Sequence, residues 1–271
     1  MRMTKFVTVL VGILGFLGCP VNSQGAPRAD SIPNFAPSSD IGWIAADQLF
    51  LPPEKGPGPV VADPAYLISK PGQDAFRVAD LSNPILQPWA REELRKVNEW
   101  ALSGKPAYTP KERCWPIGVP GFVLYAVFPT YFLQTPKKVV MIWAEDHQVR
   151  HIYLNRRHST RVKPSWFGES VGRYEGDTLV VDTIGLNTRT FVDSYRTPHT
   201  DNLHVLERFR TIDGGRTMEV RLHVEDAGAS RHRGTRFNGI AASTPAAVRR
   251  IRACRATASK KWLAPKIMAI F

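Results

Sequence analysis

Cysteine is scarce in this chain, and the cysteines lack the spacing of a metal-binding or redox motif. The 271 residues contain only Cys19, Cys114 and Cys254. A structural zinc site needs pairs of ligands a few residues apart, so the sequence predicts no metal site. The H-E-x-x-H motif, the P-loop and the G-x-G-x-x-G motif are also absent. These absences exclude several specific classes of enzyme, and we expect no cofactor.

The apolar run at the N-terminus is too short to cross a membrane. Phe6–Gly18 falls below the about 20 residues that a membrane-spanning helix needs. Two basic residues precede it, which predicts a signal peptide over residues 1–23, cleaved after Ser23 or Gly25. We therefore expect a periplasmic or secreted protein with no transmembrane segment in its mature form.

The three cysteines are expected to differ in their chemical state. Cys19 ends the imperfect lipobox Phe-Leu-Gly-Cys, so a lipid anchor at Cys19 stays open as an alternative to release as a free protein. Cys114 and Cys254 would then remain in an oxidising compartment. They are the candidate disulfide pair, and two unpaired thiols are the alternative.

The positive charge is concentrated at the two ends of the chain. The formal net charge is +12, but residues 229–271 contain ten Lys or Arg residues and no Asp or Glu, and the leader adds two more cations. Residues 24–228 are therefore close to neutral. A nearly neutral body is not typical of a protein that binds nucleic acid, so we expect no nucleic-acid partner.

The composition divides the chain into four parts. Residues 24–84 follow the leader, are rich in Pro and Gly, and predict an extended arm with little regular structure. From Pro88 to Gly104, apolar residues recur at helical spacing, which predicts one amphipathic helix. That helix begins a single β domain over residues 85–240. Residues 241–271 form a basic tail, whose alternative explanation is a gene end with a disrupted reading frame.

After the helix, the chain has the pattern of β-strands. Two hairpins are expected: Ser165–Ile184 turns at Glu175-Gly176-Asp177, and His204–Glu225 turns at Asp213-Gly214-Gly215. A last strand is expected near Thr235–Ile240. About eight short strands, with no alternation of strand and helix, predict a mainly β fold: an antiparallel meander forming a barrel or strongly curved sheet. The other expected strands are Gly121–Pro129, Tyr131–Thr135, Lys138–Glu145 and Val149–Asn155.

Histidines and carboxylates near the strand ends are the candidate functional residues. They could act as acid and base, because imidazole titrates near neutral pH and a carboxylate fixes its tautomer. Their spacing matches no compact metal motif. The structural alternative is that they satisfy turns or pair with neighbours. The candidates are His147, Asp182, His199, His204 and Glu207.

Strand phase limits how these candidates can combine. In a regular strand, His204 shares a face with Leu206, whereas Glu207 shares one with Val205, so His204 and Glu207 cannot line one cavity. Asp182 interrupts an apolar strand. It is either a partly buried carboxylate that needs Arg173 or a His as donor, or a surface residue on the wet face.

Several long strings resemble a large family of exported bacterial proteins of unknown function. The resemblance covers roughly residues 76–228. It implies an exported β-rich domain with acidic and His positions like those above, and it assigns them no roles. The strings lie at Phe76–Ala90, Arg113–Phe122, Gln134–Trp143, Asp146–Arg150, Glu175–Asn187 (E-G-D-T-L-V-V-D-T-I-G-L-N) and Arg196–Arg210.

Three functions remain open from the sequence. The first is binding of a small apolar or amphipathic molecule in a barrel-like cavity, which aromatic residues would line unless they are simply core. The second is a cofactor-independent hydrolase, lyase or isomerase that uses His199 or His204 with Asp182 or Glu207. The third is an envelope scaffold without a small ligand. The aromatic residues concerned are Trp143, Tyr153, Trp166, Phe167 and Tyr174.

Overall fold

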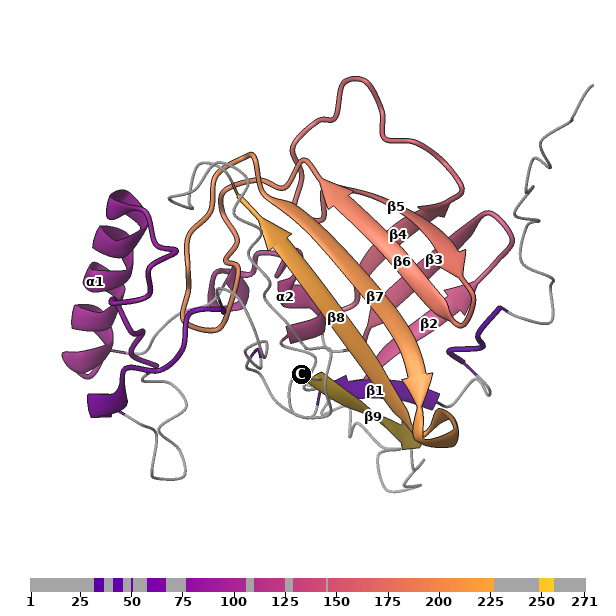
Figure 1. Cartoon of the computed structure of the whole chain (residues 1–271), viewed down its shortest axis with the longest axis horizontal. Coiled ribbons are helices and arrows are strands. Elements are labelled where there is room, and N and C mark those ends of the chain that lie inside the picture. Colours follow the sequence, from indigo (N-terminus) through magenta and orange to yellow (C-terminus); the bar gives the residue numbers. More distant parts are fainter. Residues whose placement is uncertain are drawn as a thin grey trace, which may run out of the picture.

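The centre of the molecule is one β-sheet closed into a barrel (Figure 1). The strands pair in chain order, and β9 pairs back with β1. This confirms the predicted fold class, a mainly β barrel accompanied by one amphipathic helix. The structure is a computed structural model that describes residues 32–36, 41–45, 50, 58–66, 77–105, 110–124, 129–144, 146–226 and 249–255.

The barrel is built from short strands, and the helices precede most of them. The helices are α1 (Pro88–Leu102) and α2 (Gly121–Leu124), with short 3-10 turns at Pro64–Tyr66, Pro110–Arg113 and Asp213–Gly215. The strands are β1 (Ile41–Ala45), β2 (Thr130–Gln134), β3 (Lys138–Trp143), β4 (Gln148–Leu154), β5 (Glu169–Glu175), β6 (Thr178–Ile184), β7 (His204–Ile212), β8 (Thr217–Glu225) and β9 (Arg249–Arg255).

One strand pair departs from the antiparallel meander. β4 and β5 run parallel, with Ile152–Leu154 beside Ser170–Gly172, whereas the other paired strands are antiparallel. A parallel pair cannot be joined by a tight hairpin. Residues 155–168 therefore form a long crossover, which projects from the top of the barrel in Figure 1.

Both predicted hairpins are present. β5 and β6 meet at Gly176, whose φ of +60° is the left-handed conformation that glycine adopts without strain. β7 and β8 meet at Asp213–Gly215, where all three residues have positive φ. Turn chemistry alone was enough to place these two hairpins.

Alternate side chains of the strands fill the barrel interior. On β8, apolar residues alternate with polar ones along the strand, and the apolar Met218, Val220, Leu222 and Val224 are buried. Aromatic rings pack across the interior: Phe132 lies 5.9 Å from Phe209 between ring centroids. Inward-facing apolar side chains that are at most 3% exposed include Trp43, Phe132, Val139, Met141, Trp143, Ile152, Leu179, Val181, Val205 and Phe209.

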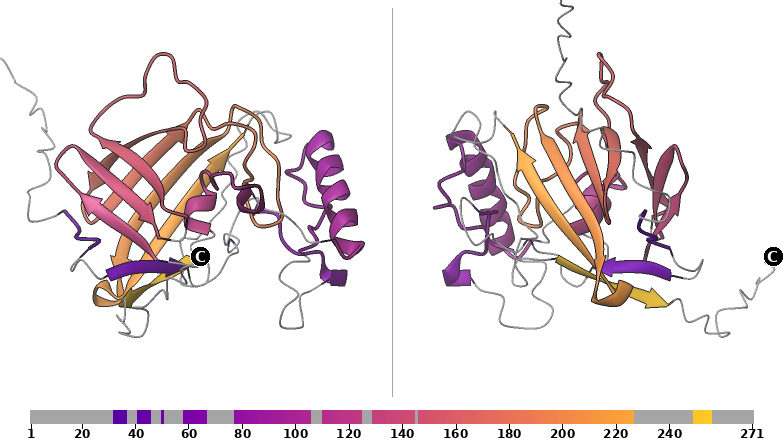
Figure 2. Two further views of the ribbon diagram at one scale, coloured as in Figure 1. Left: turned by 180° about the vertical axis from the view of Figure 1, so that it is seen from behind. Right: turned by 45° about the vertical axis from the view of Figure 1, so that its right-hand side comes forward.

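Helix α1 stands beside the barrel, as both views of Figure 2 show. It begins at Pro88 as predicted, and Gly104 adopts a φ of +76° just beyond its end. The buried Asn98 anchors it. Its side chain accepts a hydrogen bond from the backbone N of Ala79 and donates one to the Ala79 carbonyl, both at 2.8 Å. This pair of bonds holds α1 against the segment that precedes it.

The prediction of a strand over Gly121–Pro129 is wrong for its first four residues. Gly121–Leu124 forms the short helix α2, and all four of its residues are buried. Phe122 packs against Trp143 and Phe167, with ring centroids 6.3 Å and 5.7 Å away. A short, wholly buried apolar run has the same composition in a helix and in a strand, so periodicity could not separate the two.

The barrel extends beyond the predicted domain at both ends. β1 lies within the predicted arm, and its Trp43 is buried and donates from Nε1 to the Phe35 carbonyl at 2.7 Å. β9 lies within the predicted basic tail and pairs with both β1 and β8. The strand expected at Thr235–Ile240 and the leader lie outside the described residues.

Candidate functional site

The barrel wall separates the candidates of β6 and β7. Glu207 faces the interior with Val205 and Phe209, whereas His204 faces outward. Asp182 is also on the outer face, because its neighbours Val181 and Thr183 point inward. The strand-phase prediction is therefore confirmed: His204 and Glu207 do not share a cavity. Asp182 and His204 come together on the outside instead.

Inside the barrel, Glu207 forms a fully buried ion pair with Arg150. The guanidinium contacts both carboxylate oxygens, and its Nη1 donates to Glu207 Oε1 at 3.0 Å. It also donates to Ser170 Oγ at 3.1 Å and Thr183 Oγ1 at 2.9 Å. The cluster joins β4, β5, β6 and β7 across the parallel junction. Every member has a partner, as a buried polar cluster requires.

Ser170 lies within a G-x-S-x-G sequence, Gly168–Gly172. A serine nucleophile of that motif stands exposed on a sharp turn between a strand and a helix. Here Ser170 is the second residue of the hairpin strand β5, 2% exposed and bonded to Arg150 and to Thr183. It is part of the buried cluster, not a nucleophile.

On the outer face, Asp182 accepts hydrogen bonds from two imidazoles. Nε2 of His204 and Nε2 of His158 each lie 3.0 Å from Asp182 Oδ1. Side chains of all three residues are between 21% and 33% exposed. The hydrogen bonds from His204 and His158 lower the pKa of Asp182. The hydrogen bond to Asp182 raises the pKa of His204.

Further carboxylates extend this outer cluster in both directions. Nδ1 of His158 lies 3.1 Å from Glu169, which also accepts from the backbone N of Ser159 at 2.7 Å and from its hydroxyl. On the other side, Glu225 lies 3.6 Å from Nδ1 of His204 and accepts from His223 at 2.6 Å. Hydrogen bonds lower the pKa of Glu169, mainly from Ser159, and that of Glu225, mainly from His223.

His158 was missed by the sequence reasoning. It belongs to the crossover 155–168, which has no periodicity, and its contacts with Glu169 and Asp182 arise only because the crossover folds back over β5 and β6. The one available signal was Asp182 itself. A carboxylate inside an apolar strand requires a donor, and a His was one of the two donors expected for it.

His199 and His147 lie away from the outer cluster. His199 is buried; its Nδ1 donates to the Thr200 carbonyl at 2.8 Å, and its Nε2 accepts from the Thr190 hydroxyl at 2.9 Å. Burial lowers the pKa of His199 and favours this neutral form. His147 is exposed in the β3–β4 turn with a φ of +53°. Neither His contacts the outer cluster.

Cysteines and possible metal ligands are two further groups of residues within the described ranges. Cys114 is an exposed free thiol, so the structure does not contain the predicted bridge to Cys254, whose side chain lies outside the described part. Within the part of the chain that the structure describes, the His, Cys, Asp and Glu side chains form no group of three arranged to hold a metal ion.

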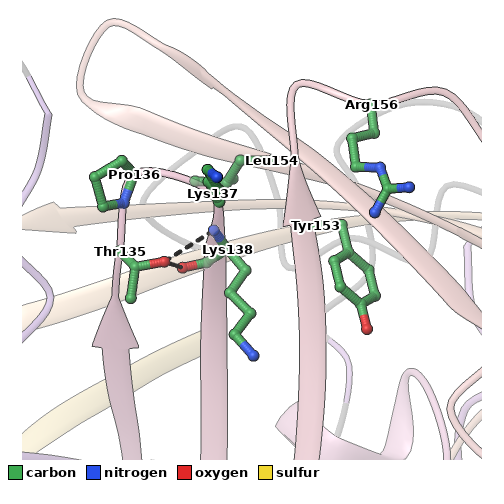
Figure 3. A pocket seen from close by; sticks show the side chains of 7 residues that line it. All are labelled: Thr135, Pro136, Lys137, Lys138, Tyr153, Leu154 and Arg156. Atoms are coloured by element: carbon green, nitrogen blue, oxygen red, sulfur yellow. Dashed lines mark hydrogen bonds between the residues drawn. The ribbon is translucent and has the colours of Figure 1, made fainter.

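An open cavity of about 730 Å³ lies where the β2–β3 turn meets the end of β4 (Figure 3). Thr135 closes the turn, because its Oγ1 donates to the Lys138 carbonyl at 2.8 Å and accepts from the Lys138 backbone N at 3.0 Å. Leu154 N donates to the Lys137 carbonyl at 2.9 Å, which fixes the turn to β4. The lining residues are Thr135, Pro136, Lys137, Lys138, Tyr153, Leu154 and Arg156.

The lining of this cavity combines cations with apolar surface. Lys137, Lys138 and Arg156 supply positive charge, and no carboxylate is among the lining residues that the structure describes. The Arg156 guanidinium carbon lies 5.4 Å from the ring centroid of Tyr153, a cation–π distance. Of the aromatic residues considered for a ligand site, Tyr153 lines this cavity, whereas Trp143 belongs to the core.

A smaller cavity of about 270 Å³ lies beside α1. Its lining mixes one acid, several cations and two aromatic rings: Glu93, Lys96, Val97, Trp100, Arg113, Phe191 and Arg196. Three cations face one carboxylate there, so this lining is less strongly positive for its size than that of the first cavity.

Comparison of the chain with protein-family models, with curated proteins and with solved structures finds no match. The resemblance to an exported bacterial family therefore stays a prediction. None of the helices in the described ranges has the length and apolar content to span a membrane.

Proposed function

We propose that this protein binds a small amphipathic anion in the cavity between the β2–β3 turn and the end of β4. The observation that carries the proposal is the described part of the lining, which has three cations, no carboxylate, and the apolar surfaces of Tyr153 and Leu154. A volume of about 730 Å³ falls within the range typical of small-molecule sites, about 300–1,000 Å³.

The chemistry of the side chains narrows the ligand to an organic carboxylate, sulfonate or phosphate. The planar guanidinium of Arg156 can donate two parallel hydrogen bonds to such a group. Tyr153, held in register beside Lys138, offers a ring against which an apolar body can pack. The ligand would thus place its charged end between Lys138 and Arg156 and its body along Tyr153.

The test uses two fluorescent probes that differ mainly in charge. The probes are 1-anilinonaphthalene-8-sulfonate, an amphipathic anion, and the uncharged N-phenyl-1-naphthylamine. We expect the anion to bind more tightly and R156A or K138A to weaken it about 3- to 10-fold each, the effect of one solvent-screened charged hydrogen bond. The neutral probe should be unaffected by these two substitutions.

R161A is the matched control, because Arg161 lies on the same crossover, is exposed and does not line the cavity. If R156A and K138A leave the affinity of the anion unchanged, the ligand binds elsewhere and the proposal is wrong. If neither probe binds, the scaffold function becomes the better explanation.

A second candidate function is acid–base catalysis by the outer cluster as a hydrolase, lyase or isomerase. It is supported by the contact of 3.0 Å between His204 and Asp182, both partly exposed. The hydrogen bond to Asp182 raises the pKa of His204, which favours the protonated form that can donate a proton. Hydrolysis of p-nitrophenyl acetate at pH 6 by the wild type, H204N and D182N tests the hydrolase case. Equal rates would mean that the cluster is structural.

We also retain the proposal that the protein is exported, with residues 1–23 as its signal. The mass of the mature protein, recovered from the periplasm or medium, separates cleavage after Ser23 or Gly25 from lipidation of Cys19.

A further inference from the structure

The outer face of β2, β3 and β4 is apolar and exposed. Cross-strand register places Leu133 beside Val140, and places Ile142 between Tyr131 and Val149. Leu133 is 53% exposed and Val149 is 40% exposed. Exposed residues of this kind scattered singly would need no explanation, but these are neighbours on one face. We call this surface, with Lys138, His151 and Tyr153, the β2–β4 face.

Cations border the β2–β4 face at one end. Lys138 pairs in register with Tyr153, and Lys137 and Arg156 lie next to them around the cavity (Figure 3). None of the outward-facing positions of these three strands carries an acid. The face therefore joins an apolar patch to a strip of uncompensated positive charge.

The opposite half of the barrel wall differs in its charge pattern. Two outward-facing carboxylates of β5 and β8 each contact two guanidinium groups. Glu175 contacts Arg173 and Arg208, and Glu219 contacts Arg210 and Arg221. The four arginine side chains of these pairs are 35–55% exposed, so this wall presents paired charges to water. The asymmetry between the two halves indicates that the β2–β4 face meets a different environment.

We propose that the β2–β4 face docks the protein on an anionic lipid bilayer. Leu133, Val149 and the two tyrosines would lie in the interfacial region, where Tyr is enriched, and the cations would contact lipid phosphates. A second copy of this chain is a poorer occupant. A two-fold contact through this face would bring the two strips of Lys and Arg into one interface without acids to neutralise them. The docking does not require a filled cavity.

The test measures binding to vesicles of phosphatidylcholine with and without 30% phosphatidylglycerol. The protein carries C19S, so that no lipid anchor contributes. We expect binding only to the anionic vesicles, weaker at higher salt. L133Q with V149T should weaken it at least 5-fold. K138A should weaken it about 5-fold, the effect of one cation near a charged surface.

Two controls keep the result specific. L102Q removes an equally exposed leucine, 51% exposed on α1, and should change nothing. Binding driven by the basic residues 229–271 would respond to salt but not to L133Q with V149T, so an unchanged affinity in that variant overturns the proposal. Equal binding to both vesicle types also overturns it.

The test of lipid binding can fail without the test of anion binding failing, and the reverse also holds. L133Q with V149T leaves every residue that lines the cavity in place, so binding of 1-anilinonaphthalene-8-sulfonate should persist in it. The wild type could instead fail to bind vesicles and form dimers at high concentration, with the dimers lost in L133Q with V149T. That result would assign the face to a second copy of the chain and refute the lipid proposal.

Discussion

Breaking the buried ion pair between Arg150 and Glu207 should destabilise the protein far more than breaking an exposed ion pair that also involves β7. Both side chains are fully buried, and the loss of one partner leaves a charge inside the barrel without compensation. Such a loss typically lowers the free energy of unfolding by about 3–5 kcal/mol. In a domain of this size, that corresponds to a fall in melting temperature of roughly 6–20 °C.

The two single variants should not be equivalent. In R150M the remaining Glu207 can become neutral by taking up a proton, whereas in E207L the guanidinium of Arg150 keeps its charge. We therefore expect E207L to be the more destabilised variant, and R150M to recover part of its stability at low pH. Urea unfolding, followed by tryptophan fluorescence at pH 5 and pH 8, measures both differences.

R208M is the matched control. Arg208 is the next residue on β7 and pairs with Glu175, and the side chains of both are about 40% exposed (40% and 39%). Its loss should lower the free energy of unfolding by less than about 1 kcal/mol. The double variant R150M with E207L should be more stable than E207L alone, because no buried charge is left. The reasoning would be refuted if R150M and E207L lost no more unfolding free energy than R208M. It would also be refuted if the loss in the double variant equalled the sum of the two single losses.

Two further predictions concern the outer cluster and the hairpins. The pKa of His204 is raised in the folded protein and that of Asp182 is lowered, so their contact stabilises most between about pH 4 and pH 6.5. H204N should therefore lose up to about 1 kcal/mol of unfolding free energy at pH 5.5 and little at pH 8.5, whereas H151Q should lose little at either pH. G176A should lose about 1 kcal/mol, since Gly176 has positive φ and open space around it. G168A should lose at least twice as much in urea unfolding, because its Cβ would collide with the Ile184 carbonyl; equal losses would contradict this.

The sequence predicted those parts of the fold that depend on local rules. The helix from Pro88, the turns at Gly176 and Asp213–Gly215 and the alternation along β8 all follow from the properties of neighbouring residues. Period-two alternation also predicted that His204 and Glu207 face opposite sides. Each of these features is decided within about ten residues of chain, which is why a single sequence was sufficient.

The features of the fold and of the site that the sequence did not predict depend on contacts between distant segments. β1 is a short strand in a region rich in Pro and Gly, and Trp43 identifies it only through burial in the barrel. α2 could have been a strand by composition. The parallel pairing of β4 with β5 sends residues 155–168 over the outer wall, and that path alone brings His158 to Asp182. The cavity likewise combines a turn, a strand end and this crossover.

The pairing of β9 with β1 has a consequence for assembly. A closed barrel has no strand edges, but this one closes through two segments from opposite ends of the sequence, Ile41–Ala45 and Arg249–Arg255. Bringing them together closes the longest loop of the fold and carries the largest entropic cost of any strand pair. Until it forms, β8 and β1 present free edges able to join the edges of other chains. Protection against aggregation therefore depends on the last strand of the barrel to be synthesised.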